Sequence, residues 1–221
     1  MGIPVLIIGQ PGSGKTCSLR NFEPDEIGIF SVSSKPLPFR KKLPVLKPAT
    51  YQSMYKAWEA GKAKNALRKV YAIDDSSLLM TFSAFARAKE TGYGKFTDFA
   101  LDFYNLVQYI ITQLPDDVIV YFLHHMEKND LGEMKAKTVG KMLDNQLSLE
   151  ALFTIVLFCQ TDGKDHWFIT QSDGYTTAKS PMEMFPEKID NDLKAVDSQI
   201  RDYYEFPALN AGKTKEQEKT A

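Results

Sequence analysis

The chain has 221 residues, of which 43% are hydrophobic and 25% charged, the ordinary composition of a globular protein. A net charge of −1 indicates no overall attraction to nucleic acid, and no apolar run is long enough to cross a membrane. The two cysteines lie far apart in the sequence, and we expect no signal peptide. Both observations favour reduced thiols in a cytoplasm. We therefore expect one cytoplasmic domain over residues 1–207, followed by a disordered polar tail at 208–221.

Apolar runs alternate with helix-like segments along most of the chain. In chain order we expect a strand at 3–8, a helix at 15–22, a strand at 27–32, a helix at 51–61 capped by Thr50, a strand at 69–74, helices at 76–90 and 98–114, strands at 118–123 and 153–159, an antiparallel return at 166–170, and a helix at 189–204. The strand at 118–123 is fully apolar, so we expect it to be central. The alternation predicts an α/β fold with a mainly parallel sheet, helices on both faces and an antiparallel edge hairpin.

The stretch GQPGSGKT fits the pattern G-x-x-x-x-G-K-[ST], the P-loop or Walker A motif, between a predicted strand and a predicted helix. Its glycines let the backbone amides turn toward phosphate oxygens, and the positive end of the helix dipole would face the same anion. Lys15 is expected to reach the β- and γ-phosphates of ATP, and Thr16 to bind Mg²⁺. The expected nucleotide-binding residues are Gly9, Gln10, Pro11, Gly12, Ser13, Gly14, Lys15, Thr16 and Cys17.

Acids and histidines follow two other predicted strands. Asp74 ends the strand in VYAIDDSS and is expected to hold Mg²⁺ through water. Asp75 either polarises the attacking water or caps the helix after it. His124 and His125 end the fourth strand; one of them, with His124 favoured, would report the γ-phosphate, and the alternative is a structural histidine.

A basic segment spans residues 35–69, where ten lysines and arginines face one glutamate, a local balance of +9. Phe39, Tyr51, Tyr55 and Trp58 lie within it. Lysines and aromatic rings together suit single-stranded DNA, whereas a lysine-rich solvated face is the alternative. The spacing of the aromatic residues at 51, 55 and 58 is equally typical of a helix's core stripe.

The P-loop, the acid-ended strand, FLHH, KTVGKMLDN and AKSPMEMF together resemble small phage-encoded ATPases with a RecA-like core, the recombinases and annealing proteins of the Sak-four type. The resemblance covers residues 3–204 and implies an ATPase that binds single-stranded DNA in recombination or annealing. It also implies a homo-oligomeric ring or filament, with a single-strand binding protein as a further partner. The loops at 127–145 and 161–164 would face DNA, and Lys179, or else Lys141, would complete a neighbouring subunit's ATP site.

The chain departs from this family at the end of the second strand, where Ser33, Ser34 and Lys35 replace the usual catalytic glutamate. Either Asp75 substitutes for that glutamate, or hydrolysis is slow. The alternative function is therefore a nucleotide-dependent loader or switch that binds a partner protein and hydrolyses little. A small-molecule kinase is disfavoured because the five arginines are not clustered as a phosphate-clamping lid requires.

Overall fold

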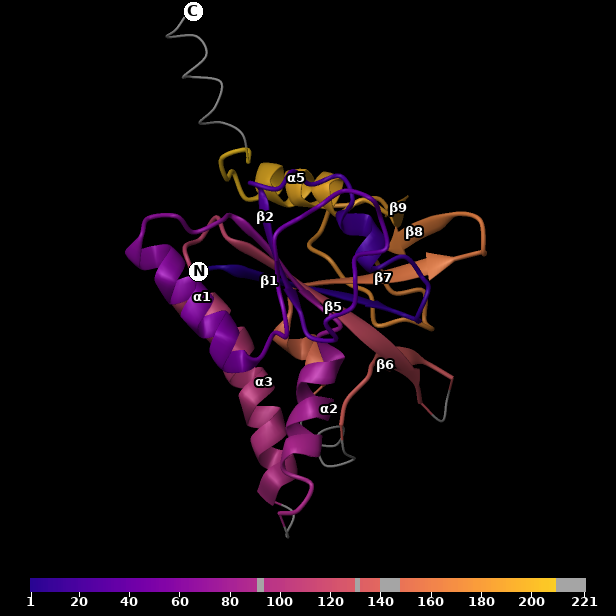
Figure 1. Cartoon of the computed structure of the whole chain (residues 1–221). Helices are drawn as coiled ribbons and strands as arrows, with labels where there is room; N and C mark the ends of the chain where they lie inside the picture. Colours follow the sequence, from indigo (N-terminus) through magenta and orange to yellow (C-terminus); the bar gives the residue numbers. More distant parts are fainter. Residues whose placement is uncertain (91–93, 130–131, 140–147, 210–221) are drawn as a thin grey trace, which may run out of the picture.

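The computed structural model describes residues 1–90, 94–129, 132–139 and 148–209 (Figure 1). The strands are β1 (Ile3–Gly9), β2 (Ile27–Ser31), β3 (Val45–Leu46), β4 (Val70–Asp74), β5 (Ile119–Lys128), β6 (Met134–Ala136), β7 (Ile155–Thr161), β8 (His166–Ile169) and β9 (Lys188–Asp190). The helices are α1 (Tyr51–Ala63), α2 (Ser77–Ala86), α3 (Gly94–Gln113) and α5 (Leu193–Tyr203), with 3-10 turns η1 (Thr16–Leu19) and η2 (Leu149–Leu152).

The main sheet has the strand order β3-β2-β4-β5-β1-β7-β8-β9, and β6 pairs with β5 outside this path. In this spatial order the first six strands, β3, β2, β4, β5, β1 and β7, are parallel to one another. β8 and β9 add an antiparallel edge. β5 therefore lies between the strand that precedes the P-loop and the strand that ends in Asp74. This is the RecA-like arrangement of a P-loop NTPase fold, and it confirms the predicted fold class and the central place of the fourth strand.

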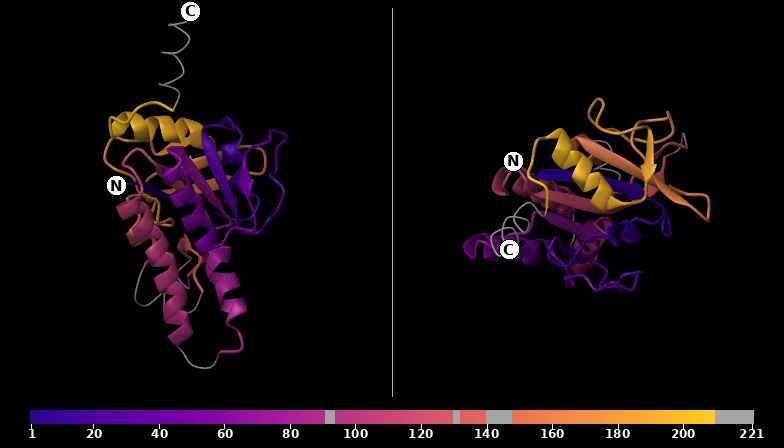
Figure 2. Two further views of the ribbon diagram at one scale, coloured as in Figure 1. Left: turned by 60° about the vertical axis from the view of Figure 1, so that its left-hand side comes forward. Right: turned by 90° about the horizontal axis from the view of Figure 1, so that it is seen from above.

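Helices cover both faces of the sheet, as Figure 2 shows. Alternate side chains of each strand point to opposite faces of the sheet. On one face α1, α2 and α3 bury one set, including Leu6, Ile73 and Phe122. On the other face η1 and α5 bury the other set, including Val5 and Tyr121, and because both faces are covered the strands are almost continuously apolar in sequence. The α2–α3 hairpin extends beyond the sheet (Figures 1 and 2).

The helix predicted at 15–22 is only the short turn η1, which is a correction to the sequence-based expectation. The Ser18 hydroxyl donates a hydrogen bond to the Lys15 carbonyl oxygen, and the backbone closes 3-10 bonds at Arg20 and Phe22. Such side-chain bonding competes with α-helix formation, and Pro24 disfavours helical geometry just beyond. The predicted contribution of a long helix dipole to phosphate binding is therefore small.

Other boundaries also differ from the predictions: α2 ends at Ala86 and not at 90, and α3 begins at Gly94 and not at 98. The helix expected at 189–204 begins only at Leu193, because the Asp192 carboxylate caps its first turn, and the residues before it form β9. The fourth strand continues beyond 123 to Lys128 and pairs with β6, so part of the loop expected at 127–145 is a β-hairpin. Residues 130–131 and 140–145 of that segment lie outside the described residues.

The aromatic residues of α1 belong to the core. Trp58 is fully buried and Tyr51 is 7% exposed, and the Trp58 ring contacts Phe30 and Tyr71. The core-stripe alternative is thus correct for these two rings. Thr50 caps the helix as predicted, in a reciprocal capping box with Ser53.

A buried ion pair fixes α5 to the opposite end of the sheet from the P-loop. Arg201 Nε donates to Asp197 Oδ2 at 2.6 Å, and its other nitrogens donate to the carbonyl oxygens of Lys69 and Asp117. Lys69 precedes β4 and Asp117 precedes β5, so one guanidinium joins the amino ends of two central strands. Asp197 also accepts a hydrogen bond from Tyr121 at 3.3 Å.

Cys17 and Cys159 are both free thiols, in agreement with the sequence-based expectation. None of the helices in the described part of the chain is both long and apolar enough to span a membrane.

Candidate nucleotide site

The P-loop leaves the carboxyl end of β1 and has the backbone geometry that its glycines allow. Gly12 and Gly14 have φ of 82° and 100°, in the left-handed region that side chains disfavour. A Cβ at Gly14 would lie 2.9 Å from His166 Nδ1, and one at Gly9 would lie 2.7 Å from the Cys159 carbonyl oxygen. Glycine is therefore required here both for conformation and for contact with β7 and β8.

Lys15 lies folded against its own loop. Its Nζ donates hydrogen bonds of 2.8 Å to the carbonyl oxygens of Gly9 and Gln10, and the residue is 7% exposed. Burial lowers the pKa of this ammonium group from its usual value. A poorly hydrated cation held at the mouth of an amide-lined loop is well placed to exchange its carbonyl partners for phosphate oxygens.

Thr16 and Asp74 meet as the sequence predicts. Thr16 Oγ1 donates to Asp74 Oδ1 at 2.7 Å, although the residues lie 58 positions apart. Asp74 is 6% exposed, and burial is the main cause that raises the pKa of its carboxyl group. A hydroxyl beside one carboxylate fits Mg²⁺, which takes few protein ligands and completes its shell with phosphate and water. Within the described residues, no group of three or more His, Cys, Asp or Glu could hold a metal by itself.

Asp75 faces the same cavity from a strained position. Its φ of 58° is left-handed, and its carboxylate lies 3.1 Å from His125 Nε2 and 3.3 Å from Lys35 Nζ. The hydrogen bond from His125 is the main cause that holds the pKa of Asp75 well below its usual range. The N-cap position of α2 is Ser76, so the helix-cap alternative for Asp75 is not what the structure shows. Strain at an ionised, cavity-facing carboxylate is typical of functional positions.

The two histidines of β5 lie on opposite faces, because side chains alternate along a strand. His125 lines the P-loop cavity, and its Nδ1 is buried without a partner. His124, which the sequence favoured, is fully buried among Ser76 Oγ at 2.9 Å and the Lys137 carbonyl oxygen at 2.7 Å. Burial lowers the pKa of His124 to about 4. Of the two histidines, His125 therefore lines the P-loop cavity, whereas His124 is enclosed in the core.

The cavity around these groups has a volume of about 330 Å³. Four of its residues were missed as site residues, and two of these, His166 and Lys35, are ionisable; the other two are Pro36 and Pro38. His166 Nδ1 lies 2.8 Å from the Ser13 carbonyl oxygen, which also accepts from Cys159 Sγ at 3.0 Å. Because a carbonyl oxygen only accepts, His166 Nδ1 is the donor in this hydrogen bond. The lining residues are Pro11, Gly12, Gly14, Lys15, Thr16, Cys17, Lys35, Pro36, Pro38, Asp74, Asp75, His125 and His166.

Lys179, the residue predicted to complete a neighbouring subunit's site, lies away from this cavity. Lys179 is exposed and pairs through its backbone with Val156 of β7. It is not among the residues that line its own subunit's P-loop cavity. Lys141 lies outside the described residues. The loop at 161–164 joins β7 to β8 as the predicted hairpin turn.

Comparison with known proteins identifies no family. No protein-family model matches the chain, and no curated protein matches its sequence. A solved structure described as "The Structure Of A DnaB-Like Replicative Helicase And Its Interactions With Primase" is similar, with a TM-score of 0.49 and 14% identity. That alignment covers 76% of this chain and 51% of the helicase chain, so this chain spans about half of the helicase chain's length. The likeness is too slight to carry a functional argument.

The fold and the site define the chain as a P-loop NTPase fold with RecA-like strand order. This class rests on the sheet order and on the P-loop geometry. Membership in the Sak-four-type family stays a prediction.

Proposed function

We propose that this chain binds ATP with Mg²⁺ and hydrolyses it. One observation carries the proposal: the ends of β1 and β4 bring Lys15, Thr16 and Asp74 around a glycine loop, with Thr16 bonded to Asp74. That set matches the needs of a triphosphate, which are backbone amides, one ammonium group and an oxygen pair for the metal. A glycine-rich turn without a ligand would need neither the buried lysine nor the buried acid.

The residues of the chain would act together in phosphoryl transfer to water. Lys15 would bind the phosphates, and Thr16 and Asp74 would orient the metal, which supplies charge neutralisation at the phosphate oxygens. Asp75, ionised at neutral pH, would orient the attacking water and accept its proton. His125 lies within hydrogen-bonding distance of Asp75 and would hold it in position, and its Nδ1, which has no partner, would report the γ-phosphate.

The test of this chemistry is Asp74→Asn, followed by ATP binding and by Mg²⁺-dependent turnover. The amide keeps the size of the side chain but removes the charge, so ATP should still bind while turnover is lost. Asp75→Asn should lower turnover as well if Asp75 replaces the missing glutamate. Unchanged turnover in Asp74→Asn would reject the metal role.

We further propose that the ATPase binds single-stranded DNA and promotes recombination or annealing as a homo-oligomer. The resemblance to Sak-four-type proteins and the basic segment at 35–69 support this. The β7–β8 turn and the β5–β6 hairpin, which were expected to face DNA, follow the same strand ends as the P-loop. Lys179 stays the candidate for a neighbouring subunit's ATP site, where Lys179→Ala should slow hydrolysis only in assembled protein.

A specific observation also favours the second function, a nucleotide-dependent switch with little hydrolysis. Lys35, and not a glutamate, follows β2 and pairs with Asp75 at 3.3 Å. A lysine that neutralises the acid would weaken it as a base. The ATPase rate with and without oligo(dT) separates the two functions: stimulation supports the DNA-dependent ATPase. ATP binding with negligible turnover in both conditions supports the switch.

A further inference from the structure

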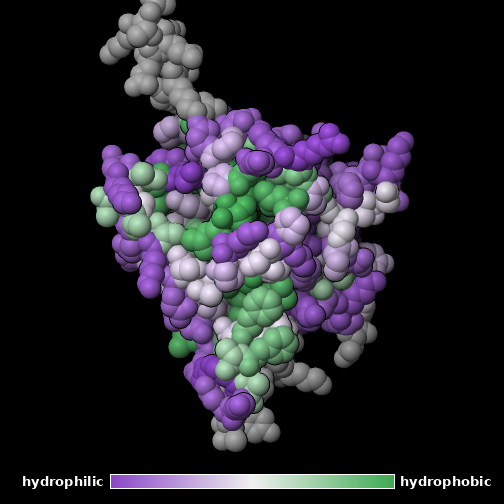
Figure 3. Space-filling view, in the orientation of Figure 1, coloured by the Kyte–Doolittle hydropathy of each residue, from purple (hydrophilic) through white to green (hydrophobic). Residues whose placement is uncertain are grey.

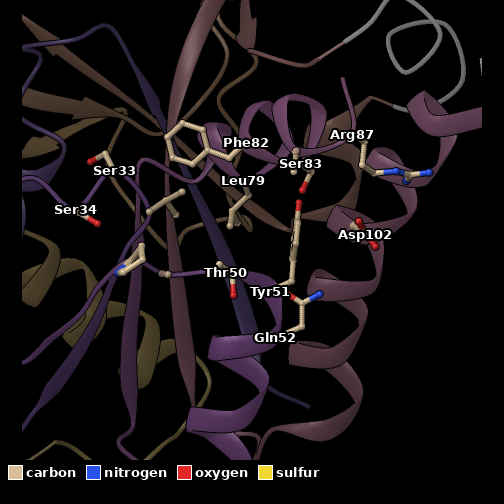
Figure 4. Close-up of a pocket in the computed structure, with 14 residues that line it drawn as sticks. Ser33, Ser34, Thr50, Tyr51, Gln52, Leu79, Phe82, Ser83, Arg87 and Asp102 are labelled. Atoms are coloured by element: carbon tan, nitrogen blue, oxygen red, sulfur yellow. The ribbon is translucent and has the colours of Figure 1, made fainter. Parts of the chain in front are cut away.

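A second cavity of about 530 Å³ lies beside the end of β2, where α1 begins and α2 passes over (Figure 4). Its walls are mostly apolar, with Ala49, Leu79, Phe82 and Ala86 among them. Its volume is within the range of ligand-binding pockets. None of its lining residues belongs to the P-loop, but Ser34 in its wall is the chain neighbour of Lys35 in the nucleotide cavity.

One end of this cavity has a hydroxyl group that lacks a partner. Tyr51 is 7% exposed, and its Oη makes no hydrogen bond. Figure 4 shows its ring extending from the start of α1 toward α2, at the level of Ser83, with Asp102 on the neighbouring helix. A buried hydroxyl without a partner is unfavourable, and a ligand that bonds to it would remove that cost. This end of the cavity therefore offers a hydroxyl and a carboxylate as hydrogen-bonding partners for the polar edge of a ligand.

An aromatic platform stands at the wall of the cavity. Phe82 is 44% exposed there, and Phe85, one turn further along α2, is 70% exposed. Figure 3 shows apolar side chains gathered over α2, with hydrophilic residues around them. An exposed ring beside a polar end suits a flat ligand that has a π-face and a hydrogen-bonding edge.

Three lysines lie close in the sequence to residues that line this cavity. Lys35 follows Ser34 of the wall, Lys47 precedes Pro48 of the wall, and Lys56 lies one helical turn after Gln52. All three lysines are exposed or have exposed side chains. Lys35 itself pairs with Asp75 in the nucleotide cavity, and the cation that lines this pocket is Arg87. A cation in an aromatic pocket matches a ligand whose flat ring is attached to phosphates. An apolar protein segment would need neither the cation nor the unpartnered hydroxyl.

We infer that this cavity binds an unstacked nucleobase, with Phe82 against its face and Tyr51 and Asp102 at its edge. The inference rests on the proposed function, since single-stranded DNA is the expected source of the base. A thymine has carbonyl oxygens that can accept from the Tyr51 hydroxyl and an N–H that can donate to Asp102. The cavity adjoins the end of β2. An inserted base would therefore contact the segment that contains Lys35, which pairs with Asp75.

The experiment measures the affinity of fluorescein-labelled oligo(dT) for the full chain and three variants by fluorescence anisotropy. Phe82→Ala should weaken binding about tenfold through lost stacking. Tyr51→Phe should weaken it about threefold to tenfold, while leaving the melting temperature of the free protein unchanged or higher. Leu101→Ala is the matched control, because Leu101 is 50% exposed on α3 but does not line the cavity, and it should bind like the wild type.

Photocrosslinking with oligo(dT) that carries 5-iododeoxyuridine, read by mass spectrometry, should label the peptide with Tyr51 or Phe82. If dTMP alone protects this peptide as well as the oligonucleotide does, the base comes from a free nucleotide, and the base chemistry of the cavity stands. Oligo(dT) binding that is equal in wild type, Phe82→Ala and Tyr51→Phe would overturn the inference and leave the proposed function intact. If the wild type binds neither oligo(dT) nor dTMP, the inference and the DNA part of the proposed function both fail, whereas ATP hydrolysis is unaffected.

Discussion

The two ends of the parallel strands differ in how their polar groups are satisfied. At the amino ends of β4 and β5, Arg201 bonds to Asp197 and to two backbone carbonyl oxygens, inside a buried setting. At the carboxyl ends, Ser13 Oγ and His125 Nδ1 are buried without partners. Arg68 Nε, just before β4, is also buried without a partner. Buried polar groups normally find hydrogen bonds, so the unmet groups beside the P-loop favour a ligand that bonds to them.

Left-handed backbone conformations occur beside the P-loop cavity and also elsewhere, at Asn65 before β4 and at Glu205 after α5. Asp75 has a left-handed φ although it is not glycine, as does Ser34 at the end of the β2 segment. Lys15 and Asp74 are both buried there, and burial shifts both pKa values toward the uncharged forms. The amino ends thus hold a hydrogen-bonded ion pair that stabilises the fold, whereas the carboxyl ends hold a buried lysine and a buried acid that a nucleotide with Mg²⁺ would stabilise.

Arg201→Met gives the largest expected effect and tests the stabilising end. Removing one partner leaves the Asp197 carboxylate buried and unpaired, so the free energy of unfolding should fall by about 3–5 kcal/mol. Urea unfolding measures it. The double variant Asp197→Leu/Arg201→Met removes both charges and should recover much of the loss. If Arg201→Met lowers the free energy of unfolding by less than about 1 kcal/mol, the claim that this ion pair stabilises the amino ends is wrong.

His124 predicts an acid-dependent loss of stability. Its folded-state pKa of about 4 lies below the 6.5 of an unperturbed histidine. Below pH 6.5 the unfolded chain binds a proton that the folded chain does not, so its stabilising contribution is present above pH 6.5 and is lost as the pH falls toward 4. The loss should amount to about 3 kcal/mol. Urea unfolding across this range should show a flatter profile for His124→Gln; identical profiles would contradict the structural role.

Lys15→Ala tests the ligand-binding end. Loss of the ammonium should weaken ATP binding about 100-fold, since it would make charge-assisted bonds to phosphate. The free energy of unfolding should change little, because burial already disfavours this charge. Isothermal calorimetry measures the affinity, with Lys41→Ala as a control, since Lys41 pairs with Glu23 and does not line the cavity. Equal ATP affinity in Lys15→Ala and wild type would refute the site.

His166→Ala gives the smallest expected effect and sharpens the comparison at the edge of the sheet. Its bond to the Ser13 carbonyl oxygen holds the P-loop against β8. Losing one such bond should cost about 1 kcal/mol, or about fivefold in ATP affinity. His166→Gln can keep a donor and should bind ATP more tightly than His166→Ala. If both variants bind ATP like the wild type, β8 does not position the loop.

The sequence was most informative where function depends on local spacing. The P-loop and the acid after β4 could be predicted because each is a short pattern at the end of an apolar strand. The choice between His124 and His125 could not be predicted, because it depends on which sheet face each side chain takes. His166 and the Arg201 network were missed for a related reason: their partners lie 153 and 132 positions away, so only the tertiary fold brings them together.

The most direct test of the central claim is hydrogen exchange, measured by mass spectrometry, of the wild-type chain with and without ATP and Mg²⁺. Binding at the carboxyl ends should slow exchange in the peptides that contain residues 9–17, 74–75 and 125. Peptides around Lys69, Asp117 and Arg201 should exchange at the same rate in both conditions. Unchanged exchange at 9–17 with saturating ATP would contradict the claim that the P-loop is a nucleotide site.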